Sequence, residues 1–244
     1  MWFSKDDVLT FNFYDEDYNL LSTKTKTIQE SEANYKGILE MPELTINAAA
    51  PATTGTAKAK LDGANEVDVT WVQLWADGPK WATINVGVTS TTATGTDLYG
   101  GLYRWGGTNE MRANTSLGDD HNTGSANLSG DNDTATKLWG SNWRMPTEAE
   151  LQGLIDNCTW SSFSGGYTVT GQGDYASNSI FLPAAGYFGF VASWEVTSAG
   201  SYGYYWSSAP YSSSAYNLLF NSSAKIPNGS NRNVGCSVRA VVSD

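Results

Sequence analysis

From Val67 to the end of the chain, short aromatic-rich segments alternate with long stretches of small polar residues. Residues 81–87, 180–182 and 238–242 have the β-branched and aromatic content of strands. Residues 106–130 are almost wholly polar and predict a long loop. Strands this short, joined by loops this long, predict an α+β fold with few helices, short strands and long loops.

The clearest helical pattern starts at Thr147. Thr147 and Glu150, three residues later, form a capping-box signature, in which each side chain accepts a hydrogen bond from the other residue's backbone N–H. One apolar stripe follows at helical spacing, made of Leu151, Leu154, Ile155 and Cys158. A second, shorter helix is expected over residues 133–138, with Asp133 as its N-cap.

Residues 1–46 carry a different pattern, in which polar and apolar residues alternate as they do in strands. The expected strands cover residues 8–14, 23–28, 35–41 and 44–46, with a turn at 15–17. Residues 47–66 begin with a run rich in Ala and Thr, which is typical of a linker. We therefore predict a small β-rich N-terminal element at 1–46, a linker at 47–66 and the main domain at 67–244.

Charged residues make up only 16% of the chain, against roughly a quarter in typical soluble domains. Lys and Arg number 14 against 25 Asp and Glu, so the net charge is −11. Because phosphate binding needs a basic face, no nucleic-acid partner is expected. The N-terminus shows no signal-peptide pattern, and the chain has no run of about 18 apolar residues, so membrane insertion is not expected.

Cys158 and Cys236 are the two cysteines of the chain. They can form one disulfide across a long loop, or they can remain free and buried. A domain of this size buries enough apolar surface to fold without a covalent cross-link, which favours free thiols.

Candidate metal ligands are few. Asp119 and Asp120, or Asp131 and Asp133, could bind calcium, but calcium needs about 6–8 oxygen ligands and no Glu-Pro-Asn-type motif is present. His121 is the single histidine, and the cysteines are far from it in sequence, so a zinc site is not expected. We predict no metal, no cofactor and no catalytic residue.

The segment from Gly200 to Val241 has an unusual composition. Tyr, Ser, Asn and Gly alternate there with a few aromatic and aliphatic residues. Antibody binding loops use the same residues, because rigid Tyr supplies contact area and small polar residues supply adaptable hydrogen bonds. Tyr204 and Tyr211 could be ordinary sheet-surface aromatics, but their polar surroundings favour contact with a ligand. The segment is typical of a binding surface rather than of a catalytic centre.

Several segments of the main domain share an order with a known family. They are residues 80–87 (KWATINVG), 103–106 (YRWG), 143–147 (WRMPT), 180–187 (IFLPAAGY), 203–208 (GYYWSS) and 237–239 (SVR). Together they resemble gut-bacterial and phage proteins with a C-type-lectin-like fold, in particular the variable proteins of diversity-generating retroelements. The resemblance covers about residues 67–242 and implies a C-type-lectin-like ligand-binding domain. One departure is Ala240, which stands where the family has Pro.

Such retroelements mutate adenines, chiefly at asparagine codons of the form AAY, which cannot become Met, Trp, Gln, Lys or Glu codons. Between residues 197 and 244, only Trp206 and Lys225 lie outside the reachable set. We call the residues expected to hold the fold of this segment framework residues, such as Trp206, Ser207, Phe220 and Val238. The resemblance implies that the varied, ligand-contacting positions are Tyr204, Ala209, Tyr211, Ser212, Ser213, Ser214, Leu219, Ile226, Ser230, Asn231, Asn233, Val234 and Cys236. Cys236 is then a varied residue rather than half of a disulfide.

The function that the resemblance implies is non-catalytic binding of a receptor or surface ligand by diversified C-terminal loops. The expected partner is a protein or glycan on a cell surface, and the expected location is a phage virion or a bacterial cell surface. The N-terminal element could form a homo-oligomer, which would strengthen weak sites through avidity. Two alternatives remain: a relative of formylglycine-generating oxidases, which requires Cys158 and Cys236 to meet, and a purely structural virion or fimbrial module.

Overall fold

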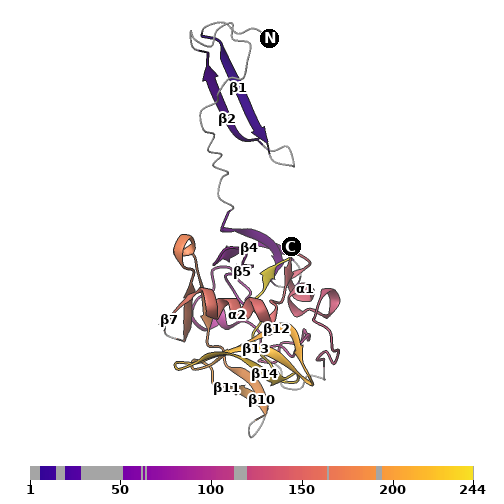
Figure 1. The fold of residues 1–244 in the computed structure, drawn as a ribbon. Coiled ribbons are helices and arrows are strands. Elements are labelled where there is room, and N and C mark those ends of the chain that lie inside the picture. The colour runs from indigo at the N-terminus through magenta and orange to yellow at the C-terminus, as the bar shows by residue number, and fades with distance from the viewer. Residues whose placement is uncertain are drawn as a thin grey trace. The chain divides into compact units, whose positions relative to one another are not determined.

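The computed structural model describes residues 6–14, 20–28, 52–61, 63, 65–112, 120–163, 165–190 and 194–243. The chain divides into two compact units, Met1–Ala52 and Thr53–Asp244 (Figure 1).

In the first unit, β1 (Val8–Tyr14) pairs antiparallel with β2 (Leu20–Thr27). These strands confirm the ones predicted at 8–14 and 23–28. The turn expected at 15–17 and the strands expected at 35–41 and 44–46 lie outside the described residues.

The second unit contains a five-stranded sheet. Its strand order is β3 (Thr54–Lys60), β4 (Glu66–Gln73), β5 (Lys80–Ala82), β15 (Val241–Val242) and β6 (Trp143–Arg144). A three-stranded sheet has the order β7 (Thr159–Phe163), β8 (Gly166–Thr170) and β9 (Ser179–Pro183). Short 3₁₀ helices cover Gly95–Tyr99, Gly130–Asn132 and Gly173–Tyr175.

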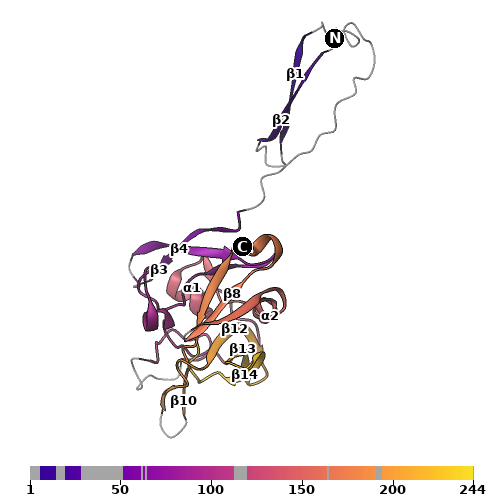
Figure 2. The ribbon, with the colours of Figure 1, turned by 90° about the vertical axis from the view of Figure 1, so that its left-hand side faces the viewer.

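The remaining strands of the second unit come from the C-terminal part of the chain. Strand β10 (Tyr187–Phe190) pairs with β11 (Trp194–Thr197). A second three-stranded sheet has the order β12 (Gly203–Tyr211), β13 (Ser214–Phe220) and β14 (Lys225–Asn231). In both views of the molecule, β10 and β14 lie at the end of this unit opposite β4 (Figure 1 and Figure 2).

Strand β3 corrects the predicted linker at 47–66. It pairs with β4 along its whole length, from Thr54 opposite Val72 to Lys60 opposite Glu66. Its small residues serve packing, since a Cβ at Gly55 would come within 2.6 Å of the Trp71 ring. The small residues that predict a flexible linker therefore belong to a strand, where they make room for the Trp71 side chain.

The part of the chain that the structure describes holds two α-helices, α1 (Thr134–Trp139) and α2 (Glu148–Asn157). Both confirm predicted helices, and the predominance of strands confirms the few-helix α+β class. The Asp133 carboxylate caps α1 by accepting a hydrogen bond from the Thr136 N–H at 2.9 Å. Of the stripe predicted on α2, Leu151, Leu154 and Cys158 are buried and Ile155 is half-buried.

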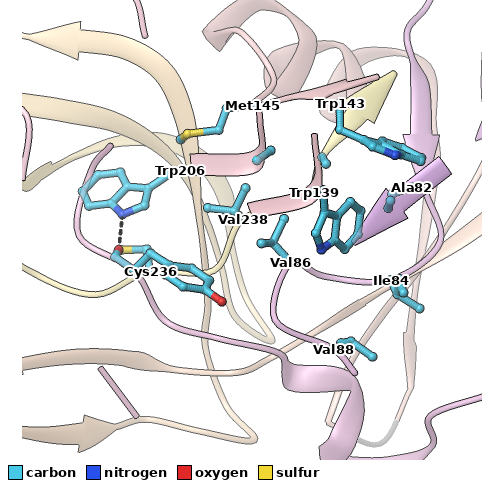
Figure 3. Packing of buried hydrophobic residues seen from close by; sticks show 14 of the residues in the cluster. Ala82, Ile84, Val86, Val88, Trp139, Trp143, Met145, Trp206, Cys236 and Val238 are labelled. Carbon is cyan, nitrogen blue, oxygen red and sulfur yellow. Dashed lines mark hydrogen bonds between the residues drawn. The ribbon is translucent and has the colours of Figure 1, made fainter. Parts of the chain in front are cut away.

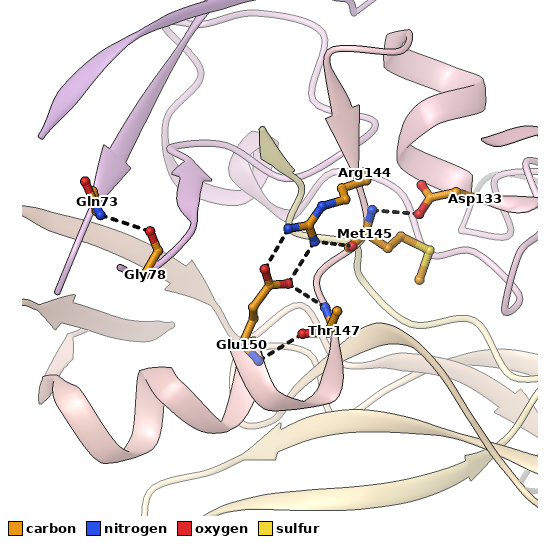
Figure 4. Close-up of polar contacts among 7 residues, drawn as sticks. All are labelled: Gln73, Gly78, Asp133, Arg144, Met145, Thr147 and Glu150. Carbon is orange, nitrogen blue, oxygen red and sulfur yellow. Dashed lines mark hydrogen bonds and ion pairs between the residues drawn. The ribbon is translucent and has the colours of Figure 1, made fainter. Parts of the chain in front are cut away.

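The predicted capping box of α2 is present (Figure 4). The Thr147 hydroxyl accepts a hydrogen bond from the Glu150 N–H at 3.1 Å, and a Glu150 carboxylate oxygen accepts one from the Thr147 N–H at 2.7 Å. The same carboxylate binds the Arg144 guanidinium through two bonds of 2.8 and 2.7 Å. Burial alone would raise the pKa of Glu150, but the bonds from Arg144 and Thr147 outweigh it and lower that pKa.

Replacing Thr147 with Ala should lower the free energy of unfolding by about 1 kcal/mol, because one N–H of the first turn of α2 loses its acceptor. Thr94 provides a matched control, since it precedes a 3₁₀ helix without a capping hydrogen bond from its side chain. Urea unfolding followed by circular dichroism should show a lower midpoint for Thr147→Ala and little change for Thr94→Ala. Equal effects of the two substitutions would contradict a role for the capping box.

Three buried clusters form the core of the described part of the second unit, and β12 enters the two larger ones. The first cluster includes Trp105, Trp206 and Cys236, and the second includes Tyr205 and Phe220. Consecutive residues of β12, Tyr205 and Trp206, point to opposite faces of the sheet and so enter different clusters. Trp206 lies beside Cys236 in the first cluster (Figure 3). Strand β12 is therefore held from both faces.

The four predicted framework residues are all buried: Trp206, Ser207 and Val238 have 0% exposure, and Phe220 has 1%. The Trp206 indole N–H also donates a hydrogen bond of 2.8 Å to the Tyr103 carbonyl oxygen. These positions therefore contribute to the interior and cannot vary freely.

Two predicted strands are shorter than expected. The strand predicted at 81–87 ends at Ala82, and only the last two residues of the segment predicted at 238–242 form a strand. Backbone hydrogen bonds still connect the two segments, from the Ala82 N–H to the Ala240 carbonyl oxygen and from the Val86 N–H to the Val238 carbonyl oxygen, each at 2.9 Å. The buried Arg239 guanidinium adds to these bonds by donating to the Asn85 side chain at 2.8 Å and to the Ala82 carbonyl oxygen at 3.0 Å.

Candidate functional site

The register of β12, β13 and β14 determines which tail residues share a face of the sheet. Tyr204 lies opposite Leu219, and Leu219 lies opposite Ile226. Residues directly opposite in an antiparallel pair point to the same side. We call Tyr204, Leu219 and Ile226 the sheet surface.

The sheet surface is apolar and aromatic. Ile226 is 45% exposed, and Tyr204 and Leu219 are half-buried. The Tyr204 ring centroid lies 4.9 Å from that of Tyr187 and 6.2 Å from that of Tyr202. Burial, with a smaller contribution from Tyr187, raises the pKa of Tyr204 to about 12. Its hydroxyl is therefore neutral at physiological pH and can donate a hydrogen bond.

A row of amides and a hydroxyl continues along the same face. The Asn217 side-chain amide donates a hydrogen bond to the Ser230 hydroxyl at 2.7 Å. The Asn228 side-chain amide donates to the Ser230 hydroxyl at 3.3 Å and to the Asn217 side-chain Oδ1 at 3.4 Å. Ser230, a predicted contact residue, is half-buried. Because its hydroxyl accepts hydrogen bonds from Asn217 and Asn228, it also holds these two side chains in place.

A second group of predicted positions lies at the turn between β12 and β13. We call Tyr211, Ser212, Ser213, Ser214 and Asn231 the tip surface. Tyr211 pairs with Ser214, and Ser214 pairs with Asn231. Ser214 is five residues from Leu219 on the same strand, so alternation places the two side chains on opposite faces. The structure therefore separates the predicted site into two surfaces.

The tip surface is centred on Tyr211, whose side chain is 51% exposed. Its ring centroid lies 4.7 Å from that of Tyr216. A Cβ at Gly229 would come within 2.6 Å of the Tyr211 ring, so only glycine leaves room for this ring position. Tyr216 and Gly229 belong to the site but were not predicted from the sequence.

Asn233 and Val234 follow β14 and are half-buried. The Asn233 carbonyl oxygen accepts a hydrogen bond from the Arg104 Nε at 3.2 Å, and the Asn233 N–H donates to the Asn231 side chain at 2.9 Å. Val234 packs at the edge of the first core cluster together with Tyr204. These two positions form the margin of the candidate site.

Ala209 and Cys236 correct the predicted set of varied positions. Cys236 has no exposed area and lies among the buried residues of the first cluster (Figure 3). Its backbone exchanges two hydrogen bonds with Tyr103, of 2.9 and 3.0 Å. Ala209 is 9% exposed, and its N–H donates to the Ser207 hydroxyl at 3.1 Å. Neither side chain can contact a ligand at the surface. The sequence did not indicate that these two residues are buried, because alanine and cysteine are both residue types that can occur at varied positions.

The two cysteines are free, which confirms the free-thiol prediction. They belong to different core clusters. Burial raises the pKa of the Cys158 thiol to about 12 and raises that of Cys236 well above its usual value. Both thiols are therefore protonated and poorly nucleophilic at physiological pH.

The charged groups of two cations in this segment lie over aromatic rings. The Lys225 Nζ lies 4.4 Å from the Tyr167 ring centroid and 5.7 Å from that of Trp160. Arg232 is buried, with 4% exposure, and stacks on the Trp105 ring at 4.3 Å. The residues that make up the sheet and tip surfaces are thus all uncharged, although the chain as a whole has a net charge of −11.

Among the described residues, no group of three or more His, Cys, Asp or Glu side chains could hold a metal ion. The Asp133 carboxylate instead accepts hydrogen bonds from the Thr136 N–H and from the Met145 N–H, the second of which is drawn in Figure 4. Asp120 accepts bonds of 3.0 Å from the Thr108 and Asn109 N–H groups. Asp119 lies outside the described residues.

A cavity of about 550 Å³ lies away from the tail, between the 3₁₀ helix Gly95–Tyr99 and strands β8 and β9, with Leu98, Tyr99 and Phe181 in its wall. None of the helices in the described part of the chain is long and apolar enough to cross a membrane.

Comparison with known proteins identified no relative: no protein-family model, curated protein or solved structure matches the chain. What the site does must therefore be inferred from the geometry and chemistry of its own residues.

Proposed function

We propose that this protein is a non-catalytic ligand-binding protein with a C-type-lectin-like domain, related to the variable proteins of diversity-generating retroelements. Its sheet and tip surfaces would form a diversified binding site. The observation that carries the proposal is the separation within the tail: apart from Ala209 and Cys236, the positions expected to vary reach solvent, whereas the framework residues are buried.

This separation allows the surface to change without loss of the fold. The framework makes its own hydrogen bonds, such as the one from the Ser207 hydroxyl to the Tyr216 carbonyl oxygen at 3.1 Å. The contact made by Tyr216 uses its backbone, so it does not depend on the side chain at that position. A rigid scaffold that presents variable side chains is the usual arrangement of recognition surfaces.

The surface chemistry supports a protein or glycan ligand on a cell surface. Tyrosine rings, aliphatic side chains, hydroxyls and amides combine apolar contact with hydrogen bonding, and none of them attracts phosphate. Presentation on a phage virion or a bacterial cell surface fits this role. The N-terminal unit would then attach or oligomerise the binding domain, and several copies would gain avidity.

The two free cysteines favour this proposal over an oxidase of the formylglycine-generating type. That chemistry requires two thiols within reach of each other. Cys158 and Cys236 belong to separate clusters, and burial raises the pKa of each.

Comparison of sister copies from one population, together with the flanking DNA, tests the proposal against a purely structural module. Diversification predicts that differences concentrate on the sheet and tip surfaces and avoid Ala209 and Cys236. It also predicts a near-copy of the 3′ coding end beside a reverse-transcriptase gene. Differences spread over all exposed loops, without such a repeat, would favour the structural module.

Substitutions at the exposed centres of the two surfaces should leave the fold intact. Ile226→Asp and Tyr211→Asp should each change the free energy of unfolding by no more than about 0.5 kcal/mol, which shifts Tm by about 2 °C. Leu218, 1% exposed, provides a buried control next to Leu219. Leu218→Ala should cost at least about 2 kcal/mol. Differential scanning calorimetry of the purified variants measures both effects, and unfolding of either Asp variant would contradict the proposed tolerance.

A further inference from the structure

Arg232, directly after β14, connects two separate segments of the chain. Its Nε donates to the Ser214 carbonyl oxygen and its Nη2 to that of Ser212, both at 2.9 Å. Its Nη1 donates to the carbonyl oxygens of Gly124 at 2.7 Å and Asn122 at 3.1 Å. One guanidinium thus binds the turn of the tip surface and a polar loop that lies 108 to 110 residues earlier in the sequence.

The guanidinium itself is held firmly. It stacks on the Trp105 ring at 4.3 Å, and the Trp105 N–H donates to the Arg232 carbonyl oxygen at 3.1 Å. The Trp105 indole donates in turn to the Ser207 carbonyl oxygen at 2.9 Å. Burial lowers the pKa of Arg232, and charge-assisted hydrogen bonds to carbonyl oxygens offset the cost of removing the charge from water.

The turn and the loop need such a support. Ser212 has a φ of 53°, an uncommon backbone conformation for a residue other than glycine, and both Ser212 and Ser213 are exposed. The loop at 123–127 is exposed as well. Hydrogen bonds hold its two ends: the Asn122 N–H donates to the Trp105 carbonyl oxygen, and the Leu128 N–H donates to the Ser208 carbonyl oxygen, each at 2.8 Å. Arg232 lies where the two exposed segments meet.

We propose that Arg232 is the positioning residue of the tip surface. It joins the 212–214 turn to the loop at 122–127 and forms from them one preorganised contact surface. This surface acts independently of the sheet surface, which lies on the other face of the β12–β14 sheet. The inference rests on the proposed ligand-binding function. Ordering the turn before binding lowers the entropy cost of association, so the small residues of the turn can contribute to binding beside Tyr211.

Two display libraries of the full chain test this assignment. One varies Tyr204, Leu219 and Ile226, and the other varies the tip positions Tyr211, Ser212, Ser213 and Asn231. Both are selected against purified lysozyme as a model protein ligand. Arg232→Lys is then introduced into selected clones of each library, because lysine keeps the charge but cannot span four carbonyl oxygens.

Arg232→Lys should weaken lysozyme binding by about 10-fold or more in clones of the tip library and by less than about 3-fold in clones of the sheet library. A residue that only stabilises the whole domain would affect both sets alike. Equal losses, or no loss in the tip clones, would overturn the positioning role.

Hydrogen exchange gives a readout that needs no ligand. Arg232→Lys should speed amide exchange at 212–214 and 122–124 and leave exchange at Leu219 unchanged. Lys80→Met serves as a control, since the Lys80 Nζ also lies over an aromatic ring, that of Trp71 at 5.0 Å. If neither library yields lysozyme binders, the proposed ligand-binding function fails. The exchange experiment then decides the role of Arg232 by itself, and unchanged exchange at 212–214 refutes the positioning role.

Discussion

Replacement of Arg239 with Met is expected to lower the free energy of unfolding by about 3–5 kcal/mol. Arg239 is 1% exposed and donates hydrogen bonds to the Asn85 side chain and to the carbonyl oxygens of Ala82 and Phe181. Methionine fills much of the space but donates nothing, so three buried acceptors lose a donor. Burial also lowers the pKa of Arg239 to about 10, which leaves the guanidinium charged at physiological pH.

Urea unfolding of the wild-type protein and of Arg239→Met at neutral pH, followed by tryptophan fluorescence, measures this effect. Arg144→Met is the matched control, because the Arg144 side chain is 28% exposed and its ion pair with Glu150 is partly hydrated. We expect it to cost about 1 kcal/mol or less. Similar costs for the two substitutions would show that Arg239 does not organise the interior.

Substitution of Cys236 with Tyr is expected to prevent folding or to cost about 3 kcal/mol or more. The Cys236 side chain lies in the first core cluster with no exposed area, and its backbone pairs with Tyr103. A tyrosine ring at this position has no space and would displace its neighbours. Cys236→Ala should cost only about 1 kcal/mol, because it removes a single small group.

The same substitution tests which positions of the tail can vary. Tyrosine is within reach of adenine mutagenesis at an AAY codon, so a varied Cys236 would have to tolerate it. Ile226→Tyr is the control, since Ile226 is 45% exposed and should accept the larger side chain with little change in stability. If Cys236→Tyr unfolds cooperatively with the same Tm as the wild-type protein, Cys236 tolerates substitution and belongs among the varied positions of the candidate site.

Helix α2 and the N-cap of α1 could be predicted because they depend on residues a few positions apart. The bonds between Thr147 and Glu150, and the one from Thr136 to Asp133, form inside a single helical turn. Strand β3 could not be predicted, because its small residues read as a linker until Trp71 is placed against Gly55. The bond from Arg239 to the Ala82 carbonyl oxygen likewise joins residues that are far apart in the chain.

For the candidate site, sequence composition pointed to a segment of the chain but not to its geometry. Alternation along β12 separates Tyr204 from Tyr205, yet nothing in the composition shows that Tyr211 lies on the other face. The roles of Tyr216, Gly229 and Arg232 also remained hidden, because each depends on a partner brought close by the fold.

The sequence by itself determined the few-helix α+β class, the local caps and the tyrosine- and serine-rich composition of the tail. These properties follow from short-range spacing and residue chemistry. Only the tertiary structure decided that the tail presents two surfaces, that Ala209 and Cys236 are buried, and that Arg232 supports the tip. The reason is physical: exposure and partnership depend on strand register and on contacts between distant segments, and neither is encoded in local pattern.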